Sequence, residues 1–327
     1  MTDNAVIPGA AAGRALVALD GGQSGARARI LWTTGGDAVH DAQCSLDAVL
    51  TDQPVVPQLA DRAGAALRQA WPDGTPAGIA EIALAAGSTG LASTASPDDL
   101  LQLVRPHGIG RVALAHDSVT CHVGALGGGP GVVVAAGTGV VTLAVGAGGL
   151  ARVDGWGHTL GDAGSGFWIG RAGLRAVLRA HDGRGRPTAL TDVVTADFVN
   201  LDDAYLVLQS DDHWVKRVAS YAKTVAGLAA TDPVCAEILD RAAAALADAA
   251  ITALRRAGGL ALPGGPPVAL VGKLFGSPLL RERFTHLLRA AVPDARFVTP
   301  QGDALDGAAG LFALTPDNPL AAQVRRA

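Results

Sequence analysis

The chain has 327 residues, of which 49% are hydrophobic and 17% are charged, so it can bury a sizeable core and global disorder is disfavoured. Its formal net charge of −4 does not show the excess of basic residues that is typical of nucleic-acid-binding proteins. The cysteines are scattered without C-x-x-C spacing, which argues against a structural zinc, an iron–sulfur cluster or a disulfide framework; they are Cys44, Cys121 and Cys235.

Residues 1–13 lack the basic start and the long apolar run of a signal peptide, so we expect a short disordered lead-in there. No later stretch reaches about 18 uninterrupted apolar residues, which is the length that a membrane-spanning helix needs. These observations predict a cytoplasmic protein with no membrane partner.

Strand and helix patterns alternate through the first half of the chain. One helix pattern places Leu59, Ala63 and Leu67 on a single face, and Pro72 follows its end. In chain order, we expect strands at Ala15–Asp20, Ala26–Trp32 and Ala38–Gln43, a helix at Gln58–Trp71, a strand at Ile79–Ala86, a helix at Pro97–Val104, a strand at Arg111–Ala115 and a helix at Val119–Leu126.

The second half begins with another three-stranded meander, so the chain contains an internal structural repeat without obvious sequence identity. We predict solvated loop charges for the two arginines of the loop over residues 182–187, Arg184 and Arg186. The expected elements are strands at Val132–Ala135, Val140–Val145 and Ala151–Asp154, helices at Phe167–Ala180, Leu190–Val199, His213–Ala230 and Val234–Ala257, a strand at Pro267–Gly272, a helix at Pro278–Ala291, a strand at Arg296–Thr299 and a helix at Ala304–Leu314.

Two glycine-rich turns of one design follow the first strand of each half. Asp20-Gly21-Gly22-Gln23-Ser24-Gly25 joins the first pair of strands, and Ala135-Ala136-Gly137-Thr138-Gly139 joins the corresponding later pair. Such a turn brings backbone N–H groups close to an anion, and the hydroxyl of Ser24 or Thr138 can donate as well. Two such turns, one of them led by an acid, predict a phosphate held between two halves of the molecule.

Four stretches of the sequence are distinctive together. They are the two phosphate turns at residues 20–24 and 136–139, a glycine-rich stretch over residues 155–170 that begins Gly-Trp-Gly-His-Thr-Leu-Gly-Asp, and a C-terminal stretch over residues 302–308. These four stretches resemble the BadF/BadG/BcrA/BcrD ATPase family, and within it the N-acetylglucosamine kinase-like branch. The stretch over residues 155–170 is the most specific of them, and residues 302–308 resemble the family's C-terminal signature.

The resemblance implies an α/β protein with a duplicated ribonuclease H-like (actin-like ATPase) fold, whose two domains lie around a nucleotide cleft. We expect the N-terminal domain to span residues 14–117 and to be completed by the C-terminal helix and tail over residues 303–327. The C-terminal domain would span residues 118–302.

The resemblance also implies ATP and Mg²⁺ as cofactors. Asp20 would help to hold the Mg²⁺, usually through water, because a carboxylate is a hard oxygen ligand. The Gly-Lys pair at residues 272–273 is not a P-loop, because it lacks the earlier glycine and the following Ser or Thr. It fits a loop beside the adenosine instead. The expected ATP-binding residues are Gly21, Gly22, Gln23, Ser24, Gly137, Thr138, Gly139, Gly272 and Lys273.

Asp117 is the candidate general base, because it lies between a buried strand and a helix N-terminus, where open α/β sheets present functional groups. The resemblance places the family's catalytic aspartate here, accepting the proton of the attacking sugar hydroxyl. It further implies sugar contacts from Trp156, Gly157 and Asp162. We assign no role to the neighbouring His116, nor to His158.

This chain departs from the sugar-kinase pattern mainly on the sugar side. Val140 and Val141 stand where this branch typically has Ser-Asn after the second phosphate turn, and valine side chains cannot form hydrogen bonds. The usual asparagine after the third strand has no clear counterpart near residues 44–47, and Ala163 stands in place of a glutamate. Losing amides that bind polar groups should alter which sugar fits.

We therefore expect an ATP-dependent kinase of an amino sugar, with N-acetylglucosamine as the first candidate and glucosamine or N-acetylmuramic acid as alternatives. A non-catalytic sugar or nucleotide sensor of the same fold is a further alternative. The dehydratase-activator ATPase, another role of this family, is disfavoured because the cysteines are not arranged for a cluster. The expected partners are ATP and a small sugar, with no nucleic acid, and a homodimer is an option because family members often dimerise.

Overall fold

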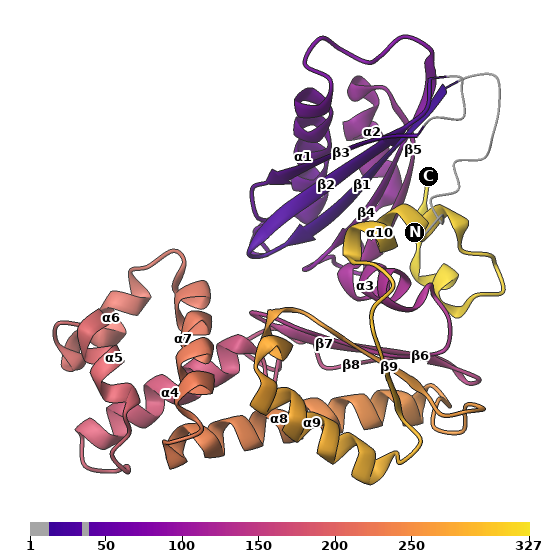
Figure 1. Cartoon of the computed structure of the whole chain (residues 1–327). Coiled ribbons are helices and arrows are strands. Elements are labelled where there is room, and N and C mark those ends of the chain that lie inside the picture. The colour runs from indigo at the N-terminus through magenta and orange to yellow at the C-terminus, as the bar shows by residue number, and fades with distance from the viewer. Residues whose placement is uncertain (1–12, 35–38) are drawn as a thin grey trace. The chain divides into compact units, whose positions relative to one another are not determined.

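The computed structural model describes residues 13–34 and 39–327, which divide into two compact units (Figure 1). Unit 1 extends to Gly129 and takes up the chain again at Thr299–Ala327, while unit 2 comprises Pro130–Val298. The sequence analysis set these divisions after residues 117 and 302. Residues 1–12 of the expected lead-in over residues 1–13, and the expected strand start at Ala38, lie outside the described residues, whereas Gly13 begins a strand.

Unit 1 is built on one six-stranded sheet, whose strands are β1 (Gly13–Gly22), β2 (Gly25–Trp32), β3 (His40–Leu46), β4 (Ile79–Ser88), β5 (Ile109–His116) and β11 (Arg325–Arg326). Their order across the sheet is β11-β5-β4-β1-β2-β3. The first three strands form an antiparallel meander, and β4 and β5 run parallel to β1. In β1 the consecutive residues Val17, Ala18 and Leu19 are all buried, because both faces of the sheet are covered.

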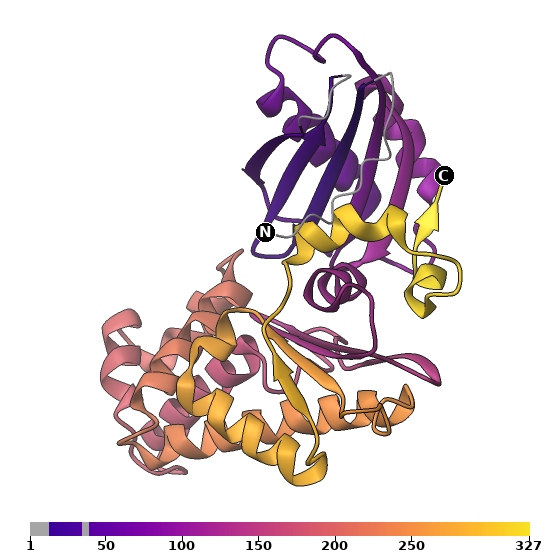
Figure 2. The same ribbon diagram turned by 45° about the vertical axis from the view of Figure 1, so that its right-hand side comes forward.

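Helices cover both faces of the unit 1 sheet (Figure 2). The helices are α1 (Val55–Ala70), α2 (Pro97–Val104), α3 (Asp117–Leu126) and α10 (Ala304–Ala309). The pair α1 and α2 packs on one face, and the pair α3 and α10 packs on the other. The last pair comes from opposite ends of the chain, so the C-terminal segment is an integral part of unit 1.

Glycines set the close approach of α3 and α10. A Cβ on Gly124 would lie 1.8 Å from the backbone oxygen of Asp303, and one on Gly307 would lie 1.7 Å from that of Thr120. The two helix backbones are therefore in direct contact, which no other residue type permits at these positions. This contact holds the start of α10 beside α3.

Unit 2 repeats the sheet of unit 1. Its strands are β6 (Gly131–Ala136), β7 (Val140–Gly146), β8 (Gly149–Val153), β9 (Pro267–Val271) and β10 (Arg296–Val298). The order β10-β9-β6-β7-β8 matches the order β5-β4-β1-β2-β3 of unit 1, with the meander antiparallel and the last two strands parallel to the first. The predicted α/β duplication is confirmed.

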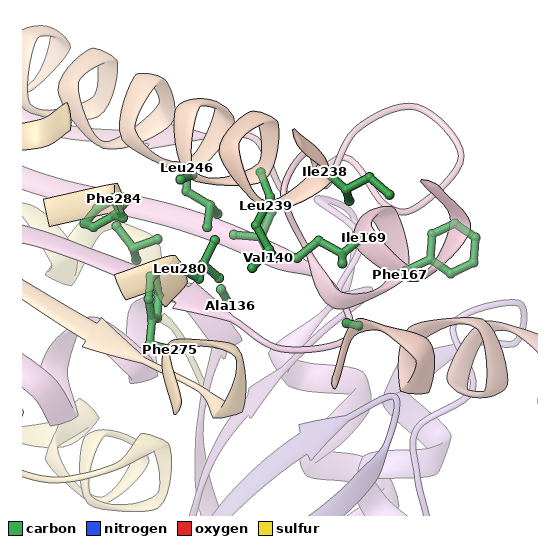
Figure 3. Packing of buried hydrophobic residues seen from close by; sticks show 14 of the residues in the cluster. Ala136, Val140, Phe167, Ile169, Ile238, Leu239, Leu246, Phe275, Leu280 and Phe284 are labelled. Atoms are coloured by element: carbon green, nitrogen blue, oxygen red, sulfur yellow. The ribbon is translucent and has the colours of Figure 1, made fainter. Parts of the chain in front are cut away.

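The helices of unit 2 build its core around a long central helix, α8. They are α4 (Gly166–His181), α5 (Leu190–Asp197), α6 (Ala204–Gln209), α7 (Trp214–Leu228), α8 (Pro233–Arg256) and α9 (Pro278–Ala291). α8 lies along β6, β7 and β8, and its Leu239 and Leu246 point toward Val140 on β7 (Figure 3). Phe284 on α9 and Ile169 on α4 extend the same core.

Two short elements, α6 and β11, are not predicted by the sequence patterns. The helix α6 has six residues and the strand β11 has two, so neither is long enough to show a period. The helix expected over Ala304–Leu314 ends at Ala309 and continues as a 3₁₀ turn over Gly310–Ala313. Tertiary pairing, rather than local pattern, determines these segments.

Candidate functional site

The first phosphate turn lies at the carboxyl end of β1 in unit 1. Residues 23–24 close the hairpin, and β4 and β5 end at the same edge of the sheet as Asp20, which pairs in register with Gly87. A Cβ on Gly21 would lie 2.9 Å from the Ser88 hydroxyl oxygen and 3.0 Å from the Val49 side chain, so a larger residue here would require these side chains to shift.

Carboxylates gather around one guanidinium at this edge. Arg27 on β2 binds Asp20 at 2.9 Å and Asp303, the N-cap of α10, at 2.7 Å. Burial raises the pKa of Asp20 above its usual value despite the bond from Arg27, and the charges of Asp117 and Asp303 raise it further. Burial also acts to raise the pKa of Asp303, but bonds from Arg27 and from the Asp306 backbone lower it overall. The edge therefore holds more negative than positive charge.

A second arginine fixes the same helix start. Arg29, two residues along β2, binds Asp41 on β3 at 2.8 Å and Asp306 on α10 at 2.6 Å. Asp303 and Asp306 also form a reciprocal capping box at the start of α10. The sequence analysis missed this network, although the alternation of arginines on β2 and the Asp-x-x-Asp spacing are both visible in the sequence.

Asp117 is the first residue of α3, directly after the end of β5. Its Oδ1 lies 2.7 Å from Nδ1 of His116 and is buried, and the same Nδ1 accepts the backbone N–H of Ser118. The side chain of His116, a residue to which the sequence analysis gave no role, therefore lies directly against the Asp117 carboxylate.

The second phosphate turn in unit 2 is joined to the start of α4. The backbone N–H of Gly137 donates to the Gly139 oxygen at 2.8 Å, which closes the turn. The oxygens of Gly137 and Thr138 in turn accept from the N–H groups of Gly166 and Phe167, at 2.8 and 3.0 Å. The turn and the first turn of α4 therefore form one hydrogen-bonded piece.

The glycine-rich loop before α4 is held by two aspartates in the left-handed region, Asp154 with φ 59° and Asp162 with φ 56°. The Asp154 carboxylate accepts the N–H groups of Asp162 and Ala163 at 2.8 and 2.9 Å. Asp162 is buried, and its Oδ1 accepts the N–H of Gly157. Its Oδ2 lies 2.6 Å from where a Cβ on Gly139 would be, so this carboxylate lies against the second phosphate turn.

The residues expected to contact sugar differ in their exposure. Trp156 is 65% exposed, and the Arg152 guanidinium lies 5.2 Å from its ring centroid. Gly157 has φ 81° and open space where a side chain would be, so the backbone is accessible. The neighbouring His158 packs against Phe167 and Trp214 in an aromatic cluster that the sequence analysis did not predict.

The Gly272–Lys273 pair lies at the end of β9, beside the second phosphate turn. Gly272 has φ 101°, and a Cβ there would lie 2.1 Å from the backbone oxygen of Ala136, the residue before the turn. Only glycine allows this approach. Lys273 is exposed and begins a 3₁₀ turn over Lys273–Gly276.

The residues singled out by the sequence analysis thus form two groups, one in each unit. Unit 1 brings together the turn at residues 20–24 and Asp117 at one sheet edge. Unit 2 brings together the turn at residues 137–139, Asp162 and Gly272. Trp156 and Lys273 extend this second group at its exposed side.

The charge at the unit 1 edge fits a magnesium ion bound with phosphates. Within residues 13–34 and 39–327, no three Asp, Glu, His or Cys side chains converge to form a ready metal cage. Mg²⁺ does not need one, since it retains waters and takes one or two carboxylates together with phosphate oxygens. Asp20 offers such a carboxylate, and a further cation would reduce the repulsion among the carboxylates that surround Arg27.

Two units with the same sheet order, each with a glycine-rich turn after its first strand, define an α/β protein of the duplicated actin-like ATPase fold. The model of the BadF/BadG/BcrA/BcrD ATPase family matches residues 20–313, so the chain belongs to this family. The resemblance inferred from the four sequence stretches is confirmed. In the described part of the chain, none of the helices combines the length and the apolar composition that a bilayer crossing demands.

Several known proteins similar to this chain are sugar kinases. An N-acetylmuramic acid/N-acetylglucosamine kinase of Clostridium acetobutylicum is 29% identical over 148 residues, which is 44% of this chain and 48% of that protein, so the match spans about half of its length. A solved structure from Chromobacterium violaceum, assigned as an N-acetylglucosamine kinase, is 29% identical with a TM-score of 0.68 and coverage of 90% and 98% of the two chains. The hexokinase of Schistosoma mansoni, solved with glucose, shares the fold at 14% identity and a TM-score of 0.54, with coverage of 92% and 86%.

Proposed function

We propose that this protein is an ATP-dependent kinase of an N-acetylated amino sugar. N-acetylglucosamine is the first candidate for its substrate, and N-acetylmuramic acid is the main alternative. The observation that carries the proposal is Asp117, a carboxylate at the carboxyl edge of the unit 1 sheet whose Oδ1 lies 2.7 Å from Nδ1 of His116. The family membership supports the use of ATP, and the names of the similar proteins support the class of sugar.

Asp117 would act as the general base. The sugar hydroxyl loses its proton to the carboxylate as its oxygen forms a bond to the γ-phosphorus of ATP, and the bond from that phosphorus to the bridging oxygen breaks to release ADP. His116 would help to position the carboxylate, because its Nδ1 lies 2.7 Å from Asp117 Oδ1.

The two glycine-rich turns would bind the phosphates through backbone N–H groups, aided by the hydroxyls of Ser24 and Thr138. Gly272 and Lys273 would lie beside the adenosine. Mg²⁺ held near Asp20 would neutralise the phosphate charge during transfer. Trp156, Gly157 and Asp162 would contact the sugar, with Asp162 also holding the loop against the second turn.

The two valines that depart from the sugar-kinase pattern are not equivalent. Val140 is buried in the unit 2 core under α8 (Figure 3), so a polar residue there would lose apolar packing. Val141 faces the opposite side of β7, and its side chain lies against Gly155 at the start of the glycine-rich loop. Of the two positions, 141 is therefore the one that we expect to influence the choice of sugar.

The test is an ADP-release assay with Mg-ATP against N-acetylglucosamine, N-acetylmuramic acid, glucosamine and glucose. We expect turnover to be highest with an N-acetylated sugar. Asp117→Asn should lower kcat by about 10²- to 10⁴-fold while ATP binding is retained. Asp98→Asn, which removes an exposed carboxylate at the start of α2 in the same unit, is the matched control and should leave kcat unchanged. Equal turnover of the Asp117 variant and the wild type would refute the assignment of the base, and no turnover with any sugar would refute the kinase.

A further inference from the structure

An arginine-lined hollow of about 460 Å³ lies on the surface of unit 2, between α4, α8 and the loop over residues 182–187. None of the residues assigned above to ATP or to sugar lines it. Six arginines do so, together with one acidic residue, Glu237. The arginines are Arg171, Arg175, Arg179, Arg184, Arg186 and Arg241.

The spacing of these arginines concentrates positive charge on one helix face. Arg171, Arg175 and Arg179 are four residues apart on α4, so they project from the same side of the helix. Like charges at this spacing repel one another and destabilise a helix. Arg241 on α8 stands opposite, with its guanidinium 5.6 Å from the Trp168 ring centroid.

Carboxylates neutralise only part of this charge. Arg186 binds Glu237, and Arg184 binds Asp182 beside the hollow. In the part of the chain that the structure describes, no ion pair joins a carboxylate to Arg171, Arg175 or Arg241. The two loop arginines are exposed, as predicted for solvated charges, and they also form one wall of this hollow.

We propose that this hollow is a binding site for a small phosphorylated molecule that carries two or more phosphate groups. Guanidinium groups bind phosphate oxygens through paired, charge-assisted hydrogen bonds, and several of them around one concave site match several phosphates. The volume lies in the range of small-molecule pockets. The chain as a whole has a net charge of −4, which disfavours a nucleic acid as the occupant.

The test uses inorganic tripolyphosphate as the probe on the full chain, with inorganic phosphate for comparison. Arginine modification by phenylglyoxal, mapped by mass spectrometry, locates the binding. We expect tripolyphosphate to protect Arg171, Arg175 and Arg241 but not Arg255, which is exposed near the end of α8. Inorganic phosphate should protect them only at higher concentration.

Calorimetric titration of variants measures the contribution of these charges. The double variant R175Q/R241Q should weaken tripolyphosphate binding at the hollow by at least about tenfold, whereas R255Q/R256Q, which removes two exposed charges at the end of α8, should not change it. Glu237→Gln should strengthen binding, because it removes a carboxylate and releases Arg186. Any tripolyphosphate bound at the turns in the two units is unaffected by these changes and is separated by the mapping.

Three outcomes would overturn the proposal. The first is the absence of protection at millimolar tripolyphosphate. The second is equal affinity of R175Q/R241Q and the wild type when both remain folded by circular dichroism. The third is protection by a single-stranded RNA oligonucleotide without protection by tripolyphosphate, which would make the hollow part of a macromolecular surface. None of these experiments depends on sugar phosphorylation, so they test the hollow whether or not the chain is a kinase.

Discussion

Gly170 on α4 provides a sharp test of how this fold holds the second phosphate turn. A Cβ at this position would lie 1.9 Å from the backbone oxygen of Val218 on α7, whereas real Cβ atoms essentially never come within 3.0 Å of another heavy atom. Gly170→Ala therefore forces the two helices apart by about 1 Å or more. The oxygen belongs to the backbone, so no side-chain rotation can relieve the contact.

The expected magnitude follows from two opposing terms. Overpacking of this kind costs about 1–3 kcal/mol or more, and the gain from replacing a helical glycine with alanine is about 1 kcal/mol. Because the clash is with backbone, we expect the upper part of the range to prevail and the free energy of unfolding to fall by about 1–2 kcal/mol. For a chain of this size, the melting temperature should then fall by about 1.5–3 °C.

Gly227→Ala on α7 is the matched control, because no atom lies within 4 Å of a Cβ built there. It should raise the free energy of unfolding by a few tenths to about 1 kcal/mol. Urea unfolding followed by circular dichroism measures both variants. If Gly170→Ala is as stable as Gly227→Ala, the close contact between the backbones of α4 and α7 is wrong. The inference that this contact helps to hold α4 beside residues 137–138 then fails as well.

Three further changes test the packing and the site. Asp232 is the N-cap of α8. Burial acts to raise its pKa, but hydrogen bonds from Cys235, Thr188 and neighbouring backbone N–H groups lower the pKa overall. The ionised carboxylate therefore stabilises the fold above about pH 4, and this stabilisation is lost as the pH falls further. Asp232→Asn should lower the free energy of unfolding by about 1–2 kcal/mol at pH 7, and urea unfolding should show this difference shrinking below pH 4. Ser165→Ala removes the N-cap of α4 and should lower the free energy of unfolding by about 1 kcal/mol in the same assay. An unchanged free energy of unfolding would show that the bond from the Trp168 N–H does not stabilise the helix. Val141→Asn should change the ratio of kcat/KM between N-acetylglucosamine and glucose by about 3- to 10-fold, and an unchanged ratio would remove residue 141 from the sugar site.

The sequence predicts the repeated sheets well because their signals are local. Buried strand segments such as residues 82–87 are continuous apolar runs, and the glycines of both turns stand where two strands meet. The helix over Pro278–Ala291 is predicted to the residue, since Ser277 caps it and a proline begins it. Local patterns of this kind therefore predict where an element begins and ends.

The charged networks are not predictable in the same way, because they join segments far apart in the chain. The bond from Arg27 to Asp303 spans 276 residues, and no local pattern indicates it. The contact of His116 with Asp117 is missed for a different reason. Its signal is only that two polar residues are adjacent, and the backbone geometry at the end of β5 makes this adjacency chemically significant.

The interleaving of the two units has a consequence for how the chain folds as it is synthesised. Unit 2 is one continuous segment, Pro130–Val298, so its sheet and helices can form as soon as that segment has left the ribosome. Unit 1 lacks α10, β11 and the Asp303 partner of Arg27 until residues 299–327 follow. Its α3 surface therefore stays uncovered through the synthesis of the whole of unit 2, and closing it requires contacts of very long sequence separation, which form slowly. The later unit would thus fold before the earlier one is complete.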